Sequence, residues 1–325
     1  MARGVILSRI ILLTAVLPAV ASAGPLWAGE GRPPDVLLVT VDTLRADHVS
    51  AYGYHRDTTP ALDALAAGGV VYDNARSTSS WTVPAAASMV TGVEPRSHGV
   101  VHGAVVFGRI GGQEVLPEEL PLLPEVMREA GYRTFAVSAN PRLDEPFGFA
   151  RGFDRFVALA FDAPADEVNA TLLGWCDEIE SAAAPVFVWL HYCDPHYVYH
   201  RNEPWFSRYR SDATAAEVEL LQSLRPDMQV VPEAIRADPD RFRDIGVALY
   251  DSEIRHWDAH LADLRQRAPR LGRALTLVTA DHGEEFLDHG HVGHGLNLYD
   301  ETVRVPMVLH GEGIPAGVGV AAPVS

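Results

Sequence analysis

The sequence predicts an α/β protein with a mostly parallel central sheet and helices on both faces of that sheet. Three apolar runs rich in β-branched residues, at 35–42, 185–190 and 274–280, have the length and composition of strands buried on both faces. Segments with helical periodicity separate these runs, and polar residues follow each of them. Strands that alternate with helices are typical of a parallel sheet, which binds ligands at the carboxyl ends of its strands.

The composition limits the class of protein. A chain of 325 residues with 47% hydrophobic residues is long enough for one large globular domain, and no second domain is required. The formal net charge of −17 argues against nucleic acid as a partner. The chain contains no lysine, so a cationic group that holds an anion has to come from arginine, histidine, a metal ion or a helix dipole.

Residues 1–23 have the features of a secretory signal peptide. Two arginines precede an apolar run at 10–20, and residues 21–23 form a small-x-small cleavage pattern. The run is short for a bilayer, so we expect a secreted or periplasmic protein with no stable membrane span after cleavage. An uncleaved N-terminal membrane anchor is the alternative. A Gly/Pro-rich linker, 24–33, follows.

The rest of the chain, 34–325, is predicted to form one catalytic domain. Further elements are expected at 59–66 (helix), 122–130 (helix), 134–138 (strand) and 244–267 (helix). Segment 199–240 is different, because it is aromatic and Arg-rich at first and then acidic with scattered prolines. An insertion that covers the substrate and a solvated connector both fit this composition. Cys176 and Cys193 are the two cysteines, and their pattern fits two buried free thiols as well as a disulfide.

Residues 80–92 predict a polar loop that runs into a short helix. Pro84 suits the first helical position, and Gly92 suits the left-handed residue after the helix end. Thr82 therefore lies close to a helix N-terminus, where backbone N–H groups and the helix dipole favour an anion. Its hydroxyl either caps the helix or faces a bound phosphate or sulfate as a nucleophile.

The ends of the first and last predicted buried strands carry metal-binding side chains. Asp42 ends the first strand, and Asp281 and His282 follow the last. With the oxygen of Thr82, they make a donor set that suits one divalent metal, Zn²⁺ or Mn²⁺ ahead of Ca²⁺ or Mg²⁺. Such a metal lowers the pKa of the hydroxyl and neutralises charge on the transferred group. The histidines nearby leave a second metal site open.

Histidines are frequent around these motifs. In a chain without lysine, they are the natural groups to bind a tetrahedral anion and to protonate a leaving oxygen. We expect His196 and His294 to be catalytic in this sense. The candidates for substrate binding are Asn140, His289 and Arg45. For each of these histidines the alternative is an ordinary loop or surface histidine.

Taken together, these motifs resemble the sulfatase branch of the alkaline phosphatase superfamily over nearly all of residues 34–325. Matching blocks occur in the same order at 39–48, 82–99, 191–196, 280–284 and 299–306. The resemblance implies that the blocks with Asp42 and Asp281 bind a divalent metal and that the block with Thr82 carries the nucleophile. It also places His196 and His294 where relatives have sulfate-contacting His and Lys residues.

Three positions depart from the family pattern. Ordinary sulfatases have Cys or Ser at the position of Thr82, converted to formylglycine, and Arg at the position of Ala86. A second aspartate usually stands where this chain has Thr43. Threonine cannot be converted to the formylglycine aldehyde by the usual modification. The set of Asp, Thr, Asp and His residues is instead similar to the sites of lipoteichoic acid synthases and phosphoethanolamine transferases, which use a threonine nucleophile. Those relatives usually carry several membrane helices.

The resemblance also implies a C-terminal antiparallel subdomain, which follows the catalytic domain in relatives. The chain stops at Ser325, so we expect a catalytic domain truncated by on the order of a hundred residues.

The predicted function is a secreted, metal-dependent hydrolase that cleaves anionic phosphate or sulfate esters through a covalent intermediate on Thr82. The ester is expected on a glycan or on a lipid head group. One alternative is a phosphoryl-group transferase with the same site. The other is a catalytically silent family member that binds anions or glycans.

Overall fold

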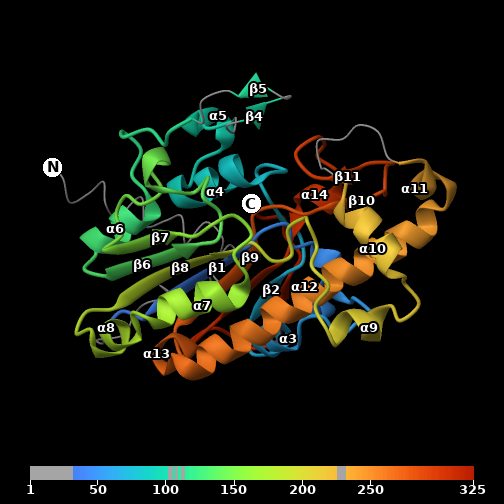
Figure 1. Ribbon diagram of the computed structural model, residues 1–325. Helices are drawn as coiled ribbons and strands as arrows, with labels where there is room; N and C mark the ends of the chain where they lie inside the picture. The colour runs from blue at the N-terminus through green and yellow to red at the C-terminus, as the bar shows by residue number, and fades with distance from the viewer. Residues whose placement is uncertain (1–31, 102–104, 107–108, 111–113, 225–231) are drawn as a thin grey trace.

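An eight-stranded sheet forms the centre of the protein in the computed structural model (Figure 1), which describes residues 32–101, 105–106, 109–110, 114–224 and 232–325. Its strands are β1 (Val36–Val41), β2 (Val70–Tyr72), β6 (Arg133–Ser138), β7 (Arg155–Ala158), β8 (Val186–Tyr192), β9 (Leu275–Ala280), β13 (Met307–His310) and β14 (Val318–Val320). Their order across the sheet is β14-β2-β13-β9-β1-β8-β6-β7. Only β13 runs antiparallel to its neighbours in this sheet, so the predicted fold class is confirmed.

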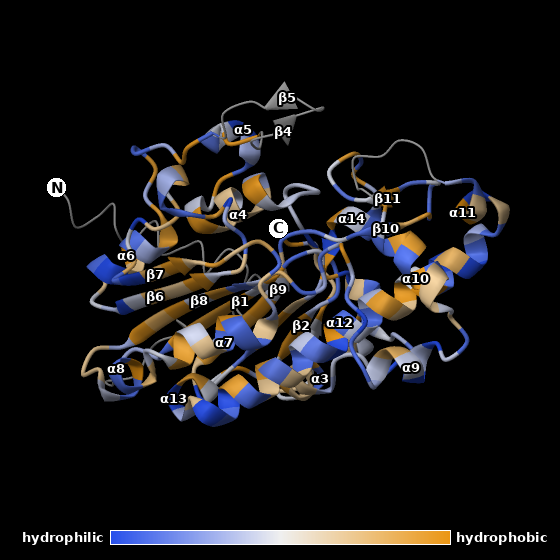
Figure 2. Ribbon diagram, in the orientation of Figure 1, coloured by the Kyte–Doolittle hydropathy of each residue, from blue (hydrophilic) through white to orange (hydrophobic). Residues whose placement is uncertain are grey.

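Helices cover both faces of the sheet (Figure 1). On one side lie α4 (Thr82–Thr91), α5 (Pro95–His98) and α6 (Leu123–Glu129). On the other side lie α3 (Pro60–Ala67), α7 (Ala165–Leu173), α8 (Cys176–Ser181), α12 (Pro239–Arg267) and α13 (Pro269–Gly272). The strands are largely hydrophobic (Figure 2), and apolar residues of α3, α4, α6, α7 and α12 are buried with them in two cores, as a two-sided sheet requires.

The side chains of each strand alternate between two cores. Leu37, Val39 and Val41 of β1 belong to the larger core, beneath α12, whereas Leu38 belongs to the smaller core, beneath α4. Trp189 of β8 also lies in the smaller core. Because side chains alternate along a strand, every second residue of β1, β8 and β9 points towards the face that carries α4.

The described part of segment 199–240 is folded. It forms α9 (Trp205–Tyr209), α10 (Ala215–Gln222) and α11 (Glu233–Ala237), and Phe206, Leu221 and Ile235 are buried in the larger core. Helix α12 begins at Pro239, before the predicted start at residue 244. The side chain of Asp238 accepts a hydrogen bond from the backbone N–H of Arg241 and so caps the first turn.

Short elements complete the described chain. They are η1 (Ala46–His48), η2 (Ser50–Tyr52), η3 (Glu145–Phe147), β3 (Ala75–Arg76), β4 (Val105–Val106), β5 (Arg109–Ile110), β10 (Glu285–Phe286), β11 (Val292–Gly293), α14 (Asp300–Val303) and β12 (Arg304–Val305). Strands β10 and β11 pair as a small antiparallel ribbon directly after the loop that ends β9.

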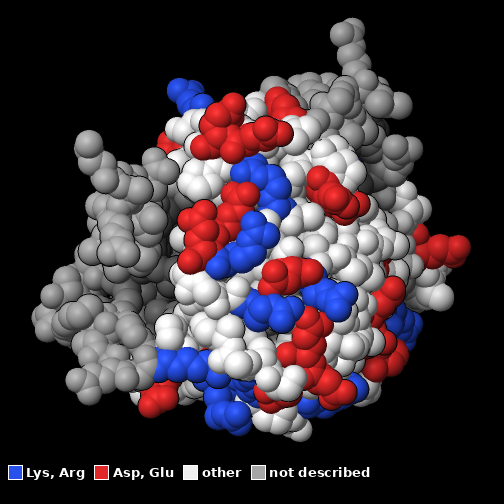
Figure 3. Space-filling view, turned by 90° about the vertical axis from the view of Figure 1, so that its left-hand side faces the viewer, with Lys and Arg blue, Asp and Glu red and all other residues white. Residues whose placement is uncertain are grey.

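Acidic and basic side chains lie next to one another on the face in Figure 3. Several form ion pairs at the β6–β7 end of the sheet: Arg133 with Asp154 and Glu178, Arg155 with Glu178, and Arg151 with Glu125. Such solvent-exposed pairs contribute little to stability, so packing in the two cores has to hold this edge.

Two predictions concern the termini and the cysteines. The predicted signal peptide, 1–23, and most of the linker lie outside the described residues. Within the described part of the chain, no helix has the length and apolar character needed to cross a membrane. Cys176 and Cys193 are both free thiols, and Cys193 is buried.

Asp258 of α12 caps another helix. Its carboxylate accepts hydrogen bonds from the backbone N–H groups of Ala61 and Leu62, both at 2.9 Å, in the first turn of α3. The residue at the N-cap position, Thr59, makes no side-chain cap of its own. Because Asp258 is fully buried, its removal leaves these N–H groups without an acceptor.

We therefore expect Asp258→Ala to lower the free energy of unfolding by about 1–3 kcal/mol in urea titrations, the cost of unsatisfied buried polar groups. The matched control is Asp263→Ala on the same helix, where an exposed carboxylate pairs with Arg267. Its effect should stay within about 0.5 kcal/mol. Equal effects of the two substitutions would show that the cap is unimportant.

Candidate metal and nucleophile site

The carboxyl ends of three adjacent parallel strands bring the predicted ligands together. Strand β1 pairs with both β8 and β9, and Asp42 and Asp281 directly follow β1 and β9. The Nε2 atom of His282 lies 3.4 Å from Oδ1 of Asp42 and 3.5 Å from Oδ2 of Asp281. All three side chains are fully buried. The parallel register of the sheet thus places the residues of the two motifs at one point.

Thr82 points into the same cluster. Its Oγ1 atom lies 3.4 Å from Oδ2 of Asp42 and 3.3 Å from Nε2 of His282. Trp81 occupies the N-cap position of α4 and makes no side-chain cap, and Thr82 is the first helical residue. Pro84 is therefore the third helical residue rather than the first, and Gly92 ends the helix in the left-handed region as predicted. The hydroxyl of Thr82 faces the cluster instead of capping the helix.

Asn140 also contacts the cluster. It follows β6, is buried, and its Nδ2 atom lies 3.4 Å from Oδ2 of Asp42. The side chain thus reaches the same carboxylate oxygen as Thr82. This places the amide at the side of the cluster that faces β6.

His191 is a member of the cluster that the sequence analysis missed. It lies in β8 opposite Thr40, and its Nε2 atom is 3.6 Å from Oδ2 of Asp42. Ligand atoms of Asp42, His191 and Asp281 all lie within 4.8 Å of one another, so this buried group could hold a metal ion. Strand periodicity could have identified it, because Asp42 and His191 both point to the face that carries α4.

Burial and charge act on the cluster in opposite directions. Burial favours the neutral form of Asp42, but His196, His191 and His282 outweigh it and lower the pKa of Asp42. Burial, and then the charge of Asp42, raise the pKa of Asp281 well above its ordinary value. Burial and the neighbouring His294 lower the pKa of His282 to about 3, so this imidazole is neutral at pH 7. A neutral imidazole beside two carboxylates is a metal-ligand set.

The hydrogen bonds of the carboxylates also fit a cation. Each carboxylate uses one oxygen: Oδ2 of Asp42 receives Thr82 and Asn140, and Oδ1 of Asp281 receives backbone N–H groups of Thr43 and His282. The other oxygens, Oδ1 of Asp42 and Oδ2 of Asp281, have no hydrogen-bond partner among the described residues. Buried oxygens without donors are costly unless a cation binds them, so the residues fit a metal.

His294 and His196 lie beside the cluster. His294 follows β11, and its ring centroid is 4.4 Å from that of His282. The ring centroid of His196 is 4.9 Å from that of His294. The Nδ1 atom of His294 lies 3.0 Å from Oε1 of Glu284. Burial favours neutral His294, but Glu284 outweighs burial and raises its pKa. Glu284 therefore favours the protonated form of the His294 imidazole, which lies beside His282.

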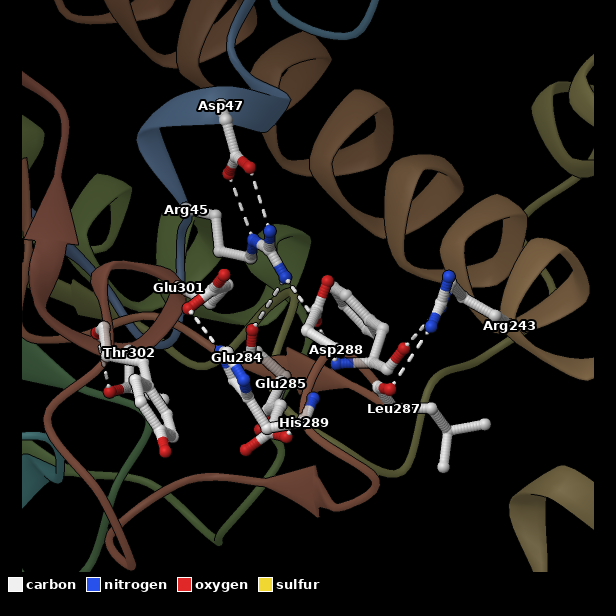
Figure 4. Close-up of polar contacts among 12 residues, drawn as sticks. Arg45, Asp47, Arg243, Glu284, Glu285, Leu287, Asp288, His289, Glu301 and Thr302 are labelled. Carbon is white, nitrogen blue, oxygen red and sulfur yellow. Dashed lines mark hydrogen bonds and ion pairs between the residues drawn. The ribbon is translucent and has the colours of Figure 1, made fainter. Parts of the chain in front are cut away.

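Arg45 and His289 hold a loop instead of reaching the cluster (Figure 4). The guanidinium of Arg45 binds Asp47, Asp288 and the backbone carbonyl of Glu284. The imidazole of His289 lies 3.4 Å from Glu301 and stacks on Tyr299.

The carboxylates that contact these two side chains lie outside the cluster, and a role of Arg45 and His289 in substrate binding stays a prediction. Their contacts tie η1 and α14 to the segment between β9 and β11. That segment leads into His294, so both residues position the loop that carries it.

The fold is an α/β sheet domain with polar residues at the carboxyl ends of its central parallel strands. The sulfatase family model matches residues 34–325, and the chain belongs to the sulfatase family. The chain is 23% identical over 313 residues to the Delta 4,5-hexuronate-2-O-sulfatase of Bacteroides thetaiotaomicron, covering 86% of this chain and 63% of that protein. It covers only 20% and 23% of the first two mammalian sulfatases that it matches.

Two solved structures show the same fold. The phosphonate monoester hydrolase of Agrobacterium radiobacter has a TM-score of 0.67 at 22% identity, over 89% of this chain and 70% of that one. The zinc-bound C-terminal periplasmic domain of EcEptC from Escherichia coli has a TM-score of 0.60 at 19% identity, over 87% and 74%. The chain therefore spans about 70% of these structural neighbours.

Added metal should stabilise the folded protein. We expect Zn²⁺ or Mn²⁺ at a hundredfold excess over Kd to raise the melting temperature of chelator-treated protein by roughly 5 °C, because binding to the folded state stabilises it by about 2.7 kcal/mol. Differential scanning fluorimetry measures the rise. Asp42→Asn and Asp281→Asn should abolish it.

The matched control for this measurement is Asp47→Asn. Asp47 lies in η1, shortly after Asp42 in the chain, but its side chain is half exposed and binds Arg45. This variant should keep the rise in melting temperature. A rise in Asp42→Asn as large as that of the unmodified protein would place the metal elsewhere.

Proposed function

We propose that this chain is a metal-dependent ester hydrolase that uses Thr82 as a covalent nucleophile. The observation that carries the proposal is the position of the Thr82 hydroxyl, 3.4 Å from a carboxylate oxygen of Asp42 and 3.3 Å from Nε2 of His282. A hydroxyl that merely stabilised α4 would bond to the first turn of that helix, and the structure does not show such a cap.

Asp42, Asp281, His282 and Thr82 would hold the metal. When bound, the metal lowers the pKa of the Thr82 hydroxyl and neutralises charge on the group in transfer. The N-terminus of α4 adds backbone N–H groups next to Thr82, where the oxygens of a tetrahedral anion would lie. The metal ligands and the N-terminus of α4 would thus orient the anion and the nucleophilic Thr82 hydroxyl without a lysine.

The first step forms the bond from Oγ1 of Thr82 to phosphorus or sulfur, and the bond from that atom to the alcohol oxygen breaks. The hydroxyl proton of Thr82 passes to solvent. The leaving oxygen takes a proton from His294 or His196, and the raised pKa of His294 supports its role as the acid. In the second step a water molecule gives a proton to that histidine and attacks the intermediate. The bond to Oγ1 breaks, and Oγ1 takes a proton from solvent, which restores the Thr82 hydroxyl.

We further propose that phosphate esters are the preferred substrates. Thr82 cannot become the aldehyde hydrate of ordinary sulfatases, and the helper arginine of that chemistry is replaced by Ala86, which is buried in the smaller core. The names of the neighbours, a phosphonate monoester hydrolase and a hexuronate sulfatase, support the broader class of anionic esters. If an alcohol replaces water in the second step, the same site performs a transfer.

We propose a secreted or periplasmic location, as the N-terminal sequence predicts. The structural neighbour described as a periplasmic domain supports it. Periplasmic fractionation of cells that express the full chain, compared with a chain that lacks residues 1–23, measures the location directly. Equal retention of both chains in the cytoplasm would contradict the proposal.

The nucleophile can be trapped. We expect intact mass spectrometry of the metal-loaded protein, quenched early in a reaction with 4-nitrophenyl phosphate, bis(4-nitrophenyl) phosphate or 4-nitrophenyl sulfate, to show an adduct that maps to Thr82. Thr82→Ala should lose the adduct and lower kcat/KM by roughly 10³-fold or more.

The matched control for trapping is Thr91→Ala. Thr91 lies on the same helix, and its hydroxyl donates to the carbonyl of Ala87 at 2.7 Å. Its activity should stay near that of the unmodified protein. Full turnover in Thr82→Ala would contradict the covalent mechanism, and sulfate turnover without phosphate turnover would contradict the preference for phosphate. If the metal-loaded protein turned over none of these esters, the result would favour the alternative of a catalytically silent binding protein.

The role of His294 should depend on the leaving group. A general acid matters for a basic alkoxide and little for nitrophenolate, so His294→Gln should slow an alkyl ester roughly 10²–10⁴-fold and the nitrophenyl ester far less. His310→Gln is the control, since β13 places that histidine opposite Thr276, near the amino end of β9. Equal losses on both esters would show that His294 does not protonate the leaving oxygen.

A further inference from the structure

A hydroxyl–histidine–indole contact lies directly beneath the metal cluster. Thr40 and His191 face each other on β1 and β8, with 2.9 Å between Oγ1 of Thr40 and Nδ1 of His191. The indole Nε1 of Trp189 donates to the same Oγ1 at 3.0 Å. All three side chains are buried. Their bonds therefore form away from water, where each donor and acceptor has to be matched.

The hydrogen bonds of Thr40 select one tautomer of His191. A threonine hydroxyl has one O–H donor and two lone pairs, and an indole N–H can only donate. Trp189 therefore occupies one lone pair of Thr40. The O–H of Thr40 has an acceptor in the backbone carbonyl of Leu190, at 3.2 Å. The second lone pair then accepts the Nδ1–H of His191, and the Nε2 atom of His191 carries a free lone pair.

The opposite tautomer leaves a donor unused. It would place an N–H on Nε2 of His191, 3.6 Å from Oδ2 of Asp42, which is too long for a hydrogen bond. No other hydrogen-bond partner of this nitrogen exists among the described residues. In the tautomer with the free lone pair, every hydrogen-bonding atom of Thr40, Trp189 and His191 has a partner once a cation lies between Nε2 of His191 and the carboxylates.

Three buried acceptor atoms without partners converge in this place. They are Nε2 of His191, Oδ1 of Asp42 and Oδ2 of Asp281. Ligand atoms of the same three residues lie within 4.8 Å of one another. A metal-binding histidine commonly donates its other ring N–H to a neighbouring acceptor, which fixes the ring and its tautomer. Thr40 occupies that position for His191.

A second histidine shows what a purely structural role looks like in this chain. His98 is also buried and also contacts a hydroxyl, with 3.0 Å between its Nε2 atom and Oγ of Ser88. Its Nδ1 atom accepts the backbone N–H of Val100 at 3.0 Å. Both ring nitrogens of His98 are thus partnered within the protein. His191 differs in that one of its nitrogens is left for a ligand.

We propose that His191 binds the metal through Nε2 and that Thr40 and Trp189 are positioning residues that hold it in the ligand tautomer. The proposal rests on the metal site of the proposed function. It adds a second imidazole to two carboxylates and one hydroxyl, and this donor set favours Zn²⁺, Co²⁺ or Mn²⁺ over Ca²⁺ and Mg²⁺.

Cobalt provides a readout that is independent of activity. Chelator-treated full-length protein is titrated with Co²⁺, and the visible absorption bands report the ligands while competition with a chelator gives the affinity. His191→Gln should change the bands and weaken binding roughly 10–100-fold. Thr40→Val should weaken binding in the same range because it removes the acceptor for Nδ1–H, and Thr40→Ser should restore it.

Ser88→Ala is the matched control, because it removes a hydroxyl from a buried histidine outside the metal cluster. It should leave the bands and the affinity unchanged. Unchanged bands and affinity in folded His191→Gln would overturn the proposal but leave the metal site intact. If the unmodified protein bound no Co²⁺, Zn²⁺ or Mn²⁺, the metal site of the proposed function would fail as well.

Nuclear magnetic resonance of the unmodified protein tests the tautomer even if the variants fail to fold. Long-range proton–nitrogen correlations of His191 should show a protonated Nδ1 and an unprotonated Nε2, and the Nε2 resonance should shift when Zn²⁺ is added. An Nε2–H that persists in the zinc-loaded protein would overturn the proposal.

Discussion

The structure depends on an electrostatic conflict at the carboxyl ends of its central strands. Asp42 and Asp281 are fully buried within reach of each other, and their pKa values are driven in opposite directions. Burial alone would expel such charges or protonate them. The neutral imidazole of His282 and the unused oxygens of both carboxylates make a cation the natural counter-charge. The fold thus concentrates buried polar groups at the carboxyl ends of adjacent strands.

The sheet supplies the precision that this cluster needs. β1 pairs on both sides with parallel strands, so small shifts in register would move Asp42 away from both its neighbours. Gly283 permits the next close approach, because a Cβ atom there would lie 1.9 Å from the backbone carbonyl of Glu301. This contact brings the start of α14 against the loop after β9. Contacts of Arg45 and His289 hold the same loop, and this loop leads into His294.

The sheet and the grouping of Asp42, Asp281 and His282 could be predicted from the sequence, because apolar strand runs and the polar residues after them are local signals. Strand periodicity places His191 on the same face of the sheet as Asp42, but it does not show what His191 contacts. Its role depends on Thr40 and Trp189, of which Thr40 lies about 150 positions away on another strand. The ion pairs of Arg45 and His289 could not be predicted either, because their acidic partners, Asp288 and Glu301, are recognisable only once the chain is folded. A short sequence motif does not show which charged residues from distant parts of the chain will form an ion pair.

The central claim is that the strand-end cluster holds a metal with the oxygen of Thr82 as a ligand. A crystal structure of the zinc-loaded protein, with anomalous diffraction recorded at the zinc absorption edge, measures this directly. We expect one strong anomalous peak about 2.0–2.2 Å from oxygens of Asp42 and Asp281 and from a nitrogen of His282, with Oγ1 of Thr82 in the same shell. A peak at another place, or a Thr82 hydroxyl turned away to cap α4, would contradict the account.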